Sequence, residues 1–527
     1  MKMKEKYILA HDHGTSGSKA ALISIYGDVI DWEFQETPLY LFDNGGAEQD
    51  PEEWWEAIIS TSTKLIDKGL VPIDDIIAVC CSSQWSGTVP VDKDGNNLMR
   101  AMIWLDSRGQ PIIKKLMKGR FINLSGYGLM RGLKFLKITG GGPALSGKDP
   151  IAHILYLKKE RPDIYNKTYK FLECVDYLNL KFTGKIAAST VSMVLHWCTD
   201  NRDLTNIDYH DKLINIFGID KEKLPRLRKC GEILGTISKD VADKLGLNKE
   251  TKVIIGAPDV PSAAIGSGAV KNYEAHVYLG TSSWLVYHVP FKKTDISHNM
   301  ASLPSAIPDR YLLCTEQETA GACLKFLKDN LIYHEDELLK EEVLPNVFKI
   351  FDKMVEDVPA GSSNLIFTPW LYGERTPIEN HSIRGGLYNI TLKTNRGDII
   401  RAVFEGIAYN TRWVLKWAEK FINNRKLDPI NMIGGGAISN IWCQIYADVL
   451  NRTIRQVKNP IQSNARGAAF IASVALGYIS FDDIPKYIKY SNIYKPNPEN
   501  RKIYDELFEE YLEIYKNNKE MFERLNG

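Results

Sequence analysis

The stretch that decides the fold is YILAHDHGTSGSKAALI, residues 7–23. An apolar run leads to Asp12, a turn rich in glycine and hydroxyl residues follows, and a second apolar run begins at Ala20. This layout predicts a strand, a tight polar turn and a second strand. The backbone N–H groups of such a turn converge where an anion can bind, and Asp12 beside it is suited to holding Mg²⁺ on a phosphate. From this stretch alone, an ordinary hairpin with a solvated Asp12 stays open.

The same layout recurs about half the chain further on, in HVYLGTSSWLVYH at residues 276–288. The tripeptide GTS stands at 14–16 and again at 280–282, each time between two apolar runs. Two similar hairpins in the two halves of a chain indicate an internal duplication. We therefore expect two phosphate-facing loops opposed across a central cleft.

The composition is that of a soluble globular protein. The 527 residues are 44% hydrophobic and 25% charged, and a chain of this length is expected to form two domains with additions. Because 66 Lys and Arg balance 65 Asp and Glu, neither nucleic acid nor a membrane surface is expected as a partner.

The sequence also favours a cytoplasmic protein. The basic start MKMKEK is not followed by the apolar core of a secretion signal, and no apolar stretch approaches the ~20 residues of a membrane helix. Eight cysteines without a CxxC motif are typical of reduced, buried thiols rather than of disulfides or a zinc site.

Polar side chains follow two predicted strands in the first half of the chain. A short buried strand at 76–81 leads into the loop SSQWSG, and a second apolar strand leads into WLDSR. The polar residues at these two ends are Gln84, Trp104, Asp106 and Arg108. Ligands bind at strand ends in sheets of this type, so these side chains are candidates for hydrogen bonds to a polyol. A surface ion pair between Asp106 and Arg108 is the alternative.

A rigidly held acid is expected at Asp259. The buried strand 253–257 leads to this residue, which stands between Pro258 and Pro261. Proline fixes its own φ, so the carboxylate at the end of this strand should face whatever lies above the sheet. We therefore predict a functional carboxylate at this position.

A second glycine-rich loop is expected to bind a nucleotide. The strand 430–433 runs into Gly-Gly-Gly-Ala at 434–437, and a helix follows at 440–450. Glycines allow close approach of a ligand, and a helix N-terminus favours an anion. The pattern is neither GxGxxG nor GxxxxGKS, so taken alone it is moderately specific.

Two other segments complete the sequence-based description. Residues 110–150 are expected to be irregular, with a break at the three glycines 140–142. The tail from about residue 497 has one apolar helical face opposite a charged face, which predicts a helix that packs back onto the body.

Taken together and in order, these motifs resemble the FGGY carbohydrate kinases, and within them the xylulokinase-like branch. The resemblance covers most of the chain. DHGTSGSK and LGTSS resemble the two phosphate loops of the family, and GAPDV resembles the strand end with the catalytic acid. SSQWSG and WLDSR resemble the sugar loops, FTPWLYGERTP resembles a stretch of this branch, and GGGAISN resembles the adenosine loop.

The resemblance implies an α/β fold with two ribonuclease-H-like domains, as in actin-like ATPases, around a central cleft. It implies an N-terminal, sugar-binding domain at 1–252, a C-terminal, nucleotide-binding domain at 253–480, and a C-terminal helical tail at 481–527. It also implies that ATP with Mg²⁺ phosphorylates a small sugar or polyol, first of all a ketose such as D-xylulose at its 5-hydroxyl. Homodimers are common in the family, so one is left open here.

The resemblance further implies a role for each candidate residue. Asp259 would be the general base, and Asp12 would hold Mg²⁺ directly or through water. The ATP-binding residues would be Gly14, Thr15, Ser16, Lys19, Gly280, Thr281, Ser282, Gly321, Gly435, Gly436, Ala437 and Asn440. The sugar-binding residues would be Gln84, Trp85, Trp104, Asp106 and Arg108, together with Asp259.

Three departures from the family pattern lie near the expected sugar site. Trp85-Ser86 replaces Met-His, and Val260 replaces the Asn or Gln that follows the catalytic acid. Residues 147–160 lack the family's Lys and Trp in its usual helix pattern. Since the phosphate loops are intact, kinase activity is better supported than xylulose as acceptor. Glycerol, ribulose, erythritol or a deoxysugar stay open as acceptors. A nucleotide-dependent binding or sensing protein on the same scaffold is the alternative from another class.

Overall fold

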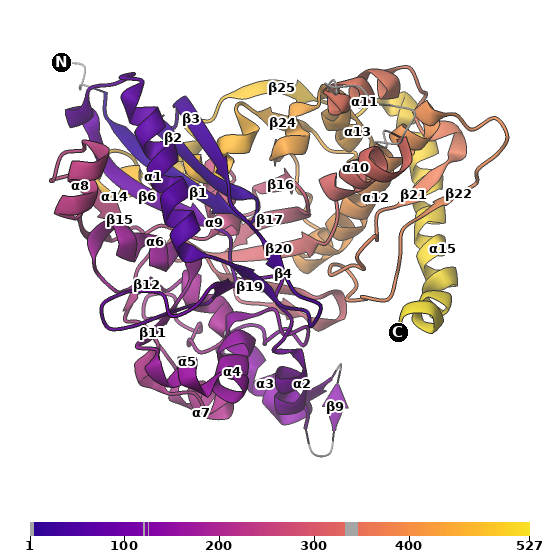
Figure 1. Cartoon of the computed structure of the whole chain (residues 1–527). Coiled ribbons are helices and arrows are strands. Elements are labelled where there is room, and N and C mark those ends of the chain that lie inside the picture. Colours follow the sequence, from indigo (N-terminus) through magenta and orange to yellow (C-terminus); the bar gives the residue numbers. More distant parts are fainter. Residues whose placement is uncertain (1–4, 120–121, 125, 333–345) are drawn as a thin grey trace, which may run out of the picture.

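The computed structural model describes residues 5–119, 122–124, 126–332 and 346–527 (Figure 1). A mixed β-sheet forms the framework of the first half. Its strands are β1 (Tyr7–Gly14), β2 (Gly17–Ser24), β3 (Val29–Glu36), β6 (Ile76–Ser83), β14 (Ile233–Thr236) and β15 (Lys252–Ile254). Their order across the sheet is β14-β15-β6-β1-β2-β3. Strand β1 runs antiparallel to β2 and parallel to β6, and β6 is parallel to β15.

A second mixed sheet forms the framework of the other half. Its strands are β16 (Ala275–Leu279), β17 (Ser283–Val289), β18 (Thr294–Asp295), β19 (Met300–Pro304), β20 (Tyr311–Gln317), β23 (Ile430–Ile433), β24 (Ile454–Val457) and β25 (Tyr490–Tyr494). Their order is β18-β19-β20-β17-β16-β23-β24-β25. Here β16 is antiparallel to β17 and parallel to β23, as β1 is to β2 and β6. The two halves thus repeat one ribonuclease-H-like topology, as the recurrence of GTS predicted.

Helix α1 (Pro51–Asp67) begins where the sequence predicted. The side chain of Asp50 accepts a hydrogen bond from the backbone N–H of Glu52, and Pro51 occupies the first turn, where its missing N–H costs nothing. Trp54, Ile58 and Leu65 lie on one face of the helix and are buried against the first sheet. Burying each of these side chains contributes roughly 1.5–3 kcal/mol.

Helix α14 (Ser463–Ala475) comes from the second half of the sequence but packs on the first sheet, against β1 and β6 (Figure 1). There it crosses α9 (Asp259–Gly266) at very close range. A Cβ on Gly266 would lie 1.7 Å from the carbonyl oxygen of Ser463, and one on Gly467 would lie 1.9 Å from that of Ser262. Only glycine fits at these two positions, so the two backbones are in direct contact.

The second sheet is covered by helices that carry the apolar core of this half. They are α10 (Gly321–Leu327), α11 (Val347–Glu356), α12 (Arg396–Phe421) and α13 (Asn440–Leu450). Helix α15 (Arg501–Asn526), drawn in yellow in Figure 1, packs onto this half through buried Tyr504, Leu507, Phe508 and Tyr511. The Tyr504 hydroxyl donates to Glu405 Oε1 at 2.8 Å, and Arg401 Nη2 donates to the same hydroxyl at 3.0 Å.

The expectation that residues 110–150 are irregular was wrong. They include helices α2 (Gln110–Met117) and α3 (Leu129–Ile138) and the short strands β9 (Asn123–Leu124) and β10 (Tyr127–Gly128). Neither helix has a side-chain N-cap, so the local signal that marks a helix start is missing. Burial of Ile113, Met117, Phe135 and Ile138 in a shared core stabilises both helices instead.

Other short elements hold the loops of the first half. The strands are β4 (Tyr40–Leu41), β5 (Ala47–Gln49), β7 (Val89–Val91), β8 (Ala101–Met102), β11 (Lys170–Leu172), β12 (Ala188–Ser189) and β13 (Leu227–Arg228). The helices are α4 (Pro150–Glu160), α5 (Pro162–Lys167), α6 (Cys174–Thr183), α7 (Asp211–Phe217) and α8 (Lys239–Leu245). In the second half, β21 (Ile366–Thr368) pairs with β22 (Gly386–Tyr388).

Each of the eight cysteines has a free thiol, as expected. No helix within the described ranges combines the length and the apolar character needed to cross a membrane. The domain limits at residues 252 and 480 stay a prediction, and strand β15 crosses the first of them.

Candidate active site

The predicted first phosphate loop is the tip of the β1–β2 hairpin. In its register Asp12 pairs with Lys19 and Gly14 with Gly17, so Thr15 and Ser16 form the turn. The Lys19 ammonium lies 2.7 Å from Asp12 Oδ2. A basic and an acidic side chain therefore stand side by side beneath the turn, in which Ser16 is exposed and Thr15 is half-buried.

Asp12 has a second partner from the far end of the sequence. Asn464 Nδ2, on α14, donates to Asp12 Oδ1 at 3.2 Å. Within the described ranges, no group of three or more His, Cys, Asp and Glu side chains could hold a metal ion. The Asp12 carboxylate is the kind of group by which Mg²⁺ is commonly held, together with phosphate and water oxygens.

Hydrogen bonds connect the first phosphate loop to the predicted sugar loops. Thr15 Oγ1 donates to Gln84 Oε1 at 3.0 Å and accepts from Trp104 Nε1 at 2.9 Å. Gln84 Nε2 donates to Gln49 Oε1 at 2.7 Å, and Gln49 Nε2 donates to the backbone oxygen of Thr15 at 2.9 Å. The sequence analysis missed Gln49, which is fully buried and directly precedes the N-cap Asp50. These hydrogen bonds join Thr15, Gln84 and Gln49 in a closed ring, so a displacement of Gln84 would also displace Thr15.

The backbone of the SSQWSG loop is hydrogen-bonded to Glu173, another residue that sequence reasoning missed. The Glu173 carboxyl accepts from the backbone N–H groups of Ser86 at 3.1 Å and Gly87 at 3.0 Å. Burial raises the pKa of Glu173 well above its ordinary value. Trp85 is buried, and its Nε1 donates to the backbone oxygen of Ser192 at 3.0 Å. The indole N–H of Trp85 is thus already used within the protein.

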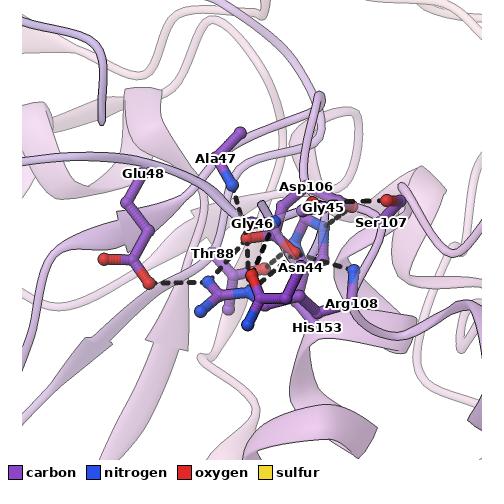
Figure 2. A network of polar contacts seen from close by, with 10 residues as sticks. All are labelled: Asn44, Gly45, Gly46, Ala47, Glu48, Thr88, Asp106, Ser107, Arg108 and His153. Atoms are coloured by element: carbon purple, nitrogen blue, oxygen red, sulfur yellow. Dashed lines mark hydrogen bonds and ion pairs between the residues drawn. The ribbon is translucent and has the colours of Figure 1, made fainter. Parts of the chain in front are cut away.

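Asp106 and Arg108 form a buried ion pair rather than a surface one, as Figure 2 shows. Arg108 Nη2 lies 2.6 Å from Asp106 Oδ2 and 2.6 Å from Glu48 Oε1. Asp106 is fully buried, and Oδ2 also accepts from the backbone N–H of Ala47 at 2.9 Å. The backbone oxygen of Asp106 is 3.2 Å from His153 Nε2. These contacts fix the end of the WLDSR loop against β5 and α4.

Asp259 lies at the start of helix α9 instead of at a strand end, because β15 ends at Ile254 and a loop follows. Its Oδ1 accepts from the backbone N–H of Val260 at 2.8 Å. Burial, reinforced by the negative charge of Asp12, raises the pKa of Asp259 to about 8. Its carboxyl group can therefore both release and accept a proton near neutral pH.

The second phosphate loop is braced by the start of α10. The N–H of Gly321 donates to the backbone oxygen of Gly280 at 2.8 Å, and that of Ala320 donates to Thr281 at 2.9 Å. A Cβ on Gly321 would lie 2.6 Å from the Gly280 oxygen, so this contact needs glycine. Within the loop, the N–H of Gly280 donates to the backbone oxygen of Ser282 at 3.0 Å. The structure thus places Gly321 against the loop, while its predicted role in ATP binding stays a prediction.

The glycine-rich loop at residues 434–437 lies directly beside the predicted second phosphate loop. A Cβ on Gly436 would lie 2.5 Å from the side chain of Leu279, the residue before Gly280. Gly435 is exposed with open space around it, which leaves its backbone accessible to a ligand. Asn440 Oδ1 accepts from Gln456 Nε2 at 3.1 Å and from the Tyr494 hydroxyl at 3.0 Å. Leu279 thus packs against the loop at 434–437 and leads directly into the loop at 280–282, so the two loops are neighbours.

Comparison with known proteins identifies this arrangement. The N-terminal domain model of the FGGY family of carbohydrate kinases matches residues 7–266, and the C-terminal domain model matches residues 275–476. The chain belongs to this family. It is therefore a carbohydrate kinase, an enzyme that phosphorylates a small-molecule sugar, and the recognition made from the ordered motifs is confirmed.

Individual relatives of this FGGY kinase carry two different names. A xylulose kinase of Staphylococcus epidermidis is 28% identical over 98% of both chains. A gluconokinase of Bacillus subtilis is 26% identical over 96% of this chain and 95% of its own. Crystal structures of a gluconate kinase and a xylulose kinase from Lactobacillus acidophilus both have a TM-score of 0.84, at 27% and 26% identity. Each covers 99% of this chain and is itself covered completely. The fold predicted from the sequence is confirmed, and the sugar is left open between these relatives.

Proposed function

We propose that this FGGY kinase transfers the terminal phosphoryl group of MgATP to a hydroxyl of a ketose such as D-xylulose, giving the 5-phosphate. The observation that carries the proposal is that two carboxylates, Asp12 and Asp259, stand in different environments. Asp12 is paired with Lys19 at 2.7 Å, whereas burial and the Asp12 charge raise the pKa of Asp259 to about 8. Carboxylates with distinct environments suit distinct roles, one for a cation and one for a proton.

In the proposed reaction Asp259 is the general base. It takes the proton of the sugar hydroxyl as the new oxygen–phosphorus bond forms. The bond between the terminal phosphorus and the bridging oxygen breaks, and ADP leaves with the bond's electron pair. General-base assistance of this kind is typically worth about 10²- to 10⁴-fold in rate. Mg²⁺, held by Asp12 directly or through water, would neutralise charge on the phosphates.

The phosphate loops from both halves would bind the triphosphate. In this proposal Gly14, Thr15, Ser16 and Lys19 face it from the first half. Gly280, Thr281, Ser282, Gly321, Gly435, Gly436, Ala437 and Asn440 form the ATP site in the second half. Backbone N–H groups of such turns bind anions, and open space at Gly435 would admit the nucleoside.

The sugar would lie beside the first phosphate loop, next to Gln84, Trp85 and Trp104. The hydrogen bonds of Thr15, which donates to Gln84 and accepts from Trp104, support this location, because they join the sugar loops to the phosphate loop. Asp106 and Arg108 would act indirectly, by holding the WLDSR loop in place, since their charged groups are already paired with each other and with Glu48. Gluconate is the second candidate acceptor, because relatives named for it are almost as similar as those named for xylulose.

The test is ADP release with MgATP and a panel of acceptors: D-xylulose, D-ribulose, D-gluconate, glycerol and erythritol. We expect strong turnover with D-xylulose and a loss of about 10²- to 10⁴-fold in the Asp259→Asn variant. The exposed Asp240, in α8, provides the matched control, and Asp240→Asn should behave as wild type. Turnover with gluconate alone would reassign the acceptor. No stimulation by any acceptor, with Asp259→Asn equal to wild type, would favour a nucleotide-dependent binding protein.

A further inference from the structure

Tyr278, in the second half of the chain, has no role in the mechanism proposed above. It lies on β16, two residues before Gly280, and is paired in register with Trp284 of β17. The two rings stack, with centroids 4.0 Å apart and planes inclined by only 6°. Stacking on a strand partner fixes the ring, so the direction of the hydroxyl is set by the sheet.

The Tyr278 hydroxyl lies against the backbone of the second phosphate loop. A Cβ on Gly280 would be 2.4 Å from a ring carbon of Tyr278 and 2.9 Å from its hydroxyl oxygen. Tyr278 is partly exposed, and its hydroxyl has no hydrogen-bond partner among the side chains and backbone groups of the described residues. A rigid O–H group therefore stands beside Gly280 without a hydrogen-bond partner among the described residues.

Charged groups of the first half act on this hydroxyl. Burial raises the pKa of Tyr278 to about 12, Lys19 opposes the shift, and Asp12 and Asp259 add to it. Lys19, Asp12 and Asp259 are the residues proposed to contact the phosphate, the magnesium ion and the reacting hydroxyl. The hydroxyl of Tyr278 thus remains protonated at neutral pH within electrostatic reach of all three.

We infer that Tyr278 is a catalytic hydrogen-bond donor, whose O–H group binds an oxygen of the phosphoryl group while it is transferred. The inference rests on the proposed kinase reaction and adds a residue to it. Tyr278 keeps its proton throughout, because the sugar proton goes to Asp259 and the bond changes occur at phosphorus. Lys19 contacts the transferring group from the first half and Tyr278 from the second, so full stabilisation requires both halves to enclose it.

A fixed donor of this kind has a large effect on rate. It is already oriented by the Trp284 stack, so no reorganisation is needed when charge develops on the phosphoryl oxygens. Removing one such donor from an enzyme typically lowers kcat by about 10²- to 10³-fold. The effect should fall on kcat, because the interaction is strongest in the transition state.

The Tyr278→Phe variant tests the inference, since it keeps the stacked ring and removes only the hydroxyl. We expect kcat to fall by about 10²-fold, with the KM of the sugar unchanged within about twofold. Tyr287→Phe is the matched control on the neighbouring strand, where the hydroxyl donates to the Ala418 backbone oxygen at 2.7 Å. That variant removes a structural hydrogen bond and should leave kcat near wild type.

A second readout does not depend on turnover. Calorimetry measures binding of MgADP with aluminium fluoride, which imitates the transferring phosphoryl group. Tyr278→Phe should bind this mixture about 10²-fold more weakly and MgADP alone as wild type does. Wild-type kcat together with wild-type binding of the fluoride mixture would overturn the inference. If wild type turns over no acceptor in the panel, the proposed function fails, while the fluoride mixture without sugar still decides the role of Tyr278.

Discussion

The ionisation of Asp259 should determine how this kinase responds to pH between 6 and 9. In the folded protein the pKa of Asp259 is about 8, compared with an ordinary value of 3.8. Only the ionised carboxylate can accept the sugar proton. It would be populated to about 1 part in 100 at pH 6, about 1 in 10 at pH 7 and about one half at pH 8. The kcat/KM should therefore rise about tenfold per pH unit below 8 and level off near pH 9.

The same raised pKa makes a prediction about stability without any ligand. The folded state holds the Asp259 proton more tightly than the unfolded state does. This contribution to stability is complete below the unfolded pKa of 3.8 and is lost as pH rises through about 8. The Asn side chain of the Asp259→Asn variant does not titrate. The free energy of unfolding of this variant should therefore rise relative to that of wild type as the pH increases from 3.8 to about 8.

Two assays check this reasoning. The first measures kcat/KM for MgATP by ADP release at constant ionic strength from pH 6 to 9. The second compares urea unfolding of wild type and Asp259→Asn from pH 4 to 9. A flat kcat/KM profile between pH 6 and 8, or an unchanged stability difference between the two proteins, would refute a raised pKa at Asp259.

Three further substitutions test the packing around the site by urea unfolding. Arg108→Met should lower the free energy of unfolding by about 3–5 kcal/mol, because it leaves the buried Asp106 carboxylate without its cation; a loss below 1 kcal/mol would contradict this. Gly467→Ala places a Cβ on the Ser262 carbonyl and should cost about 3 kcal/mol or more; wild-type stability would mean that the two helices can separate freely. Tyr504→Phe should cost about 1–2 kcal/mol by breaking a buried network with α12, with kcat unchanged; a changed kcat would contradict a purely structural role.

The parts of the fold that could be predicted from the sequence are those encoded locally. Apolar runs around a glycine-rich turn at 14–17, and again at 280–282, are enough to specify two hairpins. A glycine run between a strand and a helix likewise specifies the loop at 434–437. The order of these motifs then pointed to the family, which the comparisons confirm.

The parts that could not be predicted depend on contacts between distant residues. Asn464, Glu173 and Gln49 are single polar residues with no repeating pattern around them, and their partners are set only by tertiary packing. Helices α2 and α3 were missed because core burial rather than capping stabilises them. The ligand roles of the site residues, the domain limits, the homodimer and the cytoplasmic location stay predictions.

Helix α14 packs on the first sheet although it lies near the end of the sequence, and this has a consequence for synthesis of the chain. A growing chain that has emerged only to residue 450 already contains both GTS loops. It still lacks the second partner of Asp12, because Asn464 lies 452 positions further along the sequence. It also leaves β1 and β6 of the first sheet without the cover that α14 provides in the finished protein. A chain that ends before α14 should therefore expose apolar surface of the first sheet and hold an incomplete site.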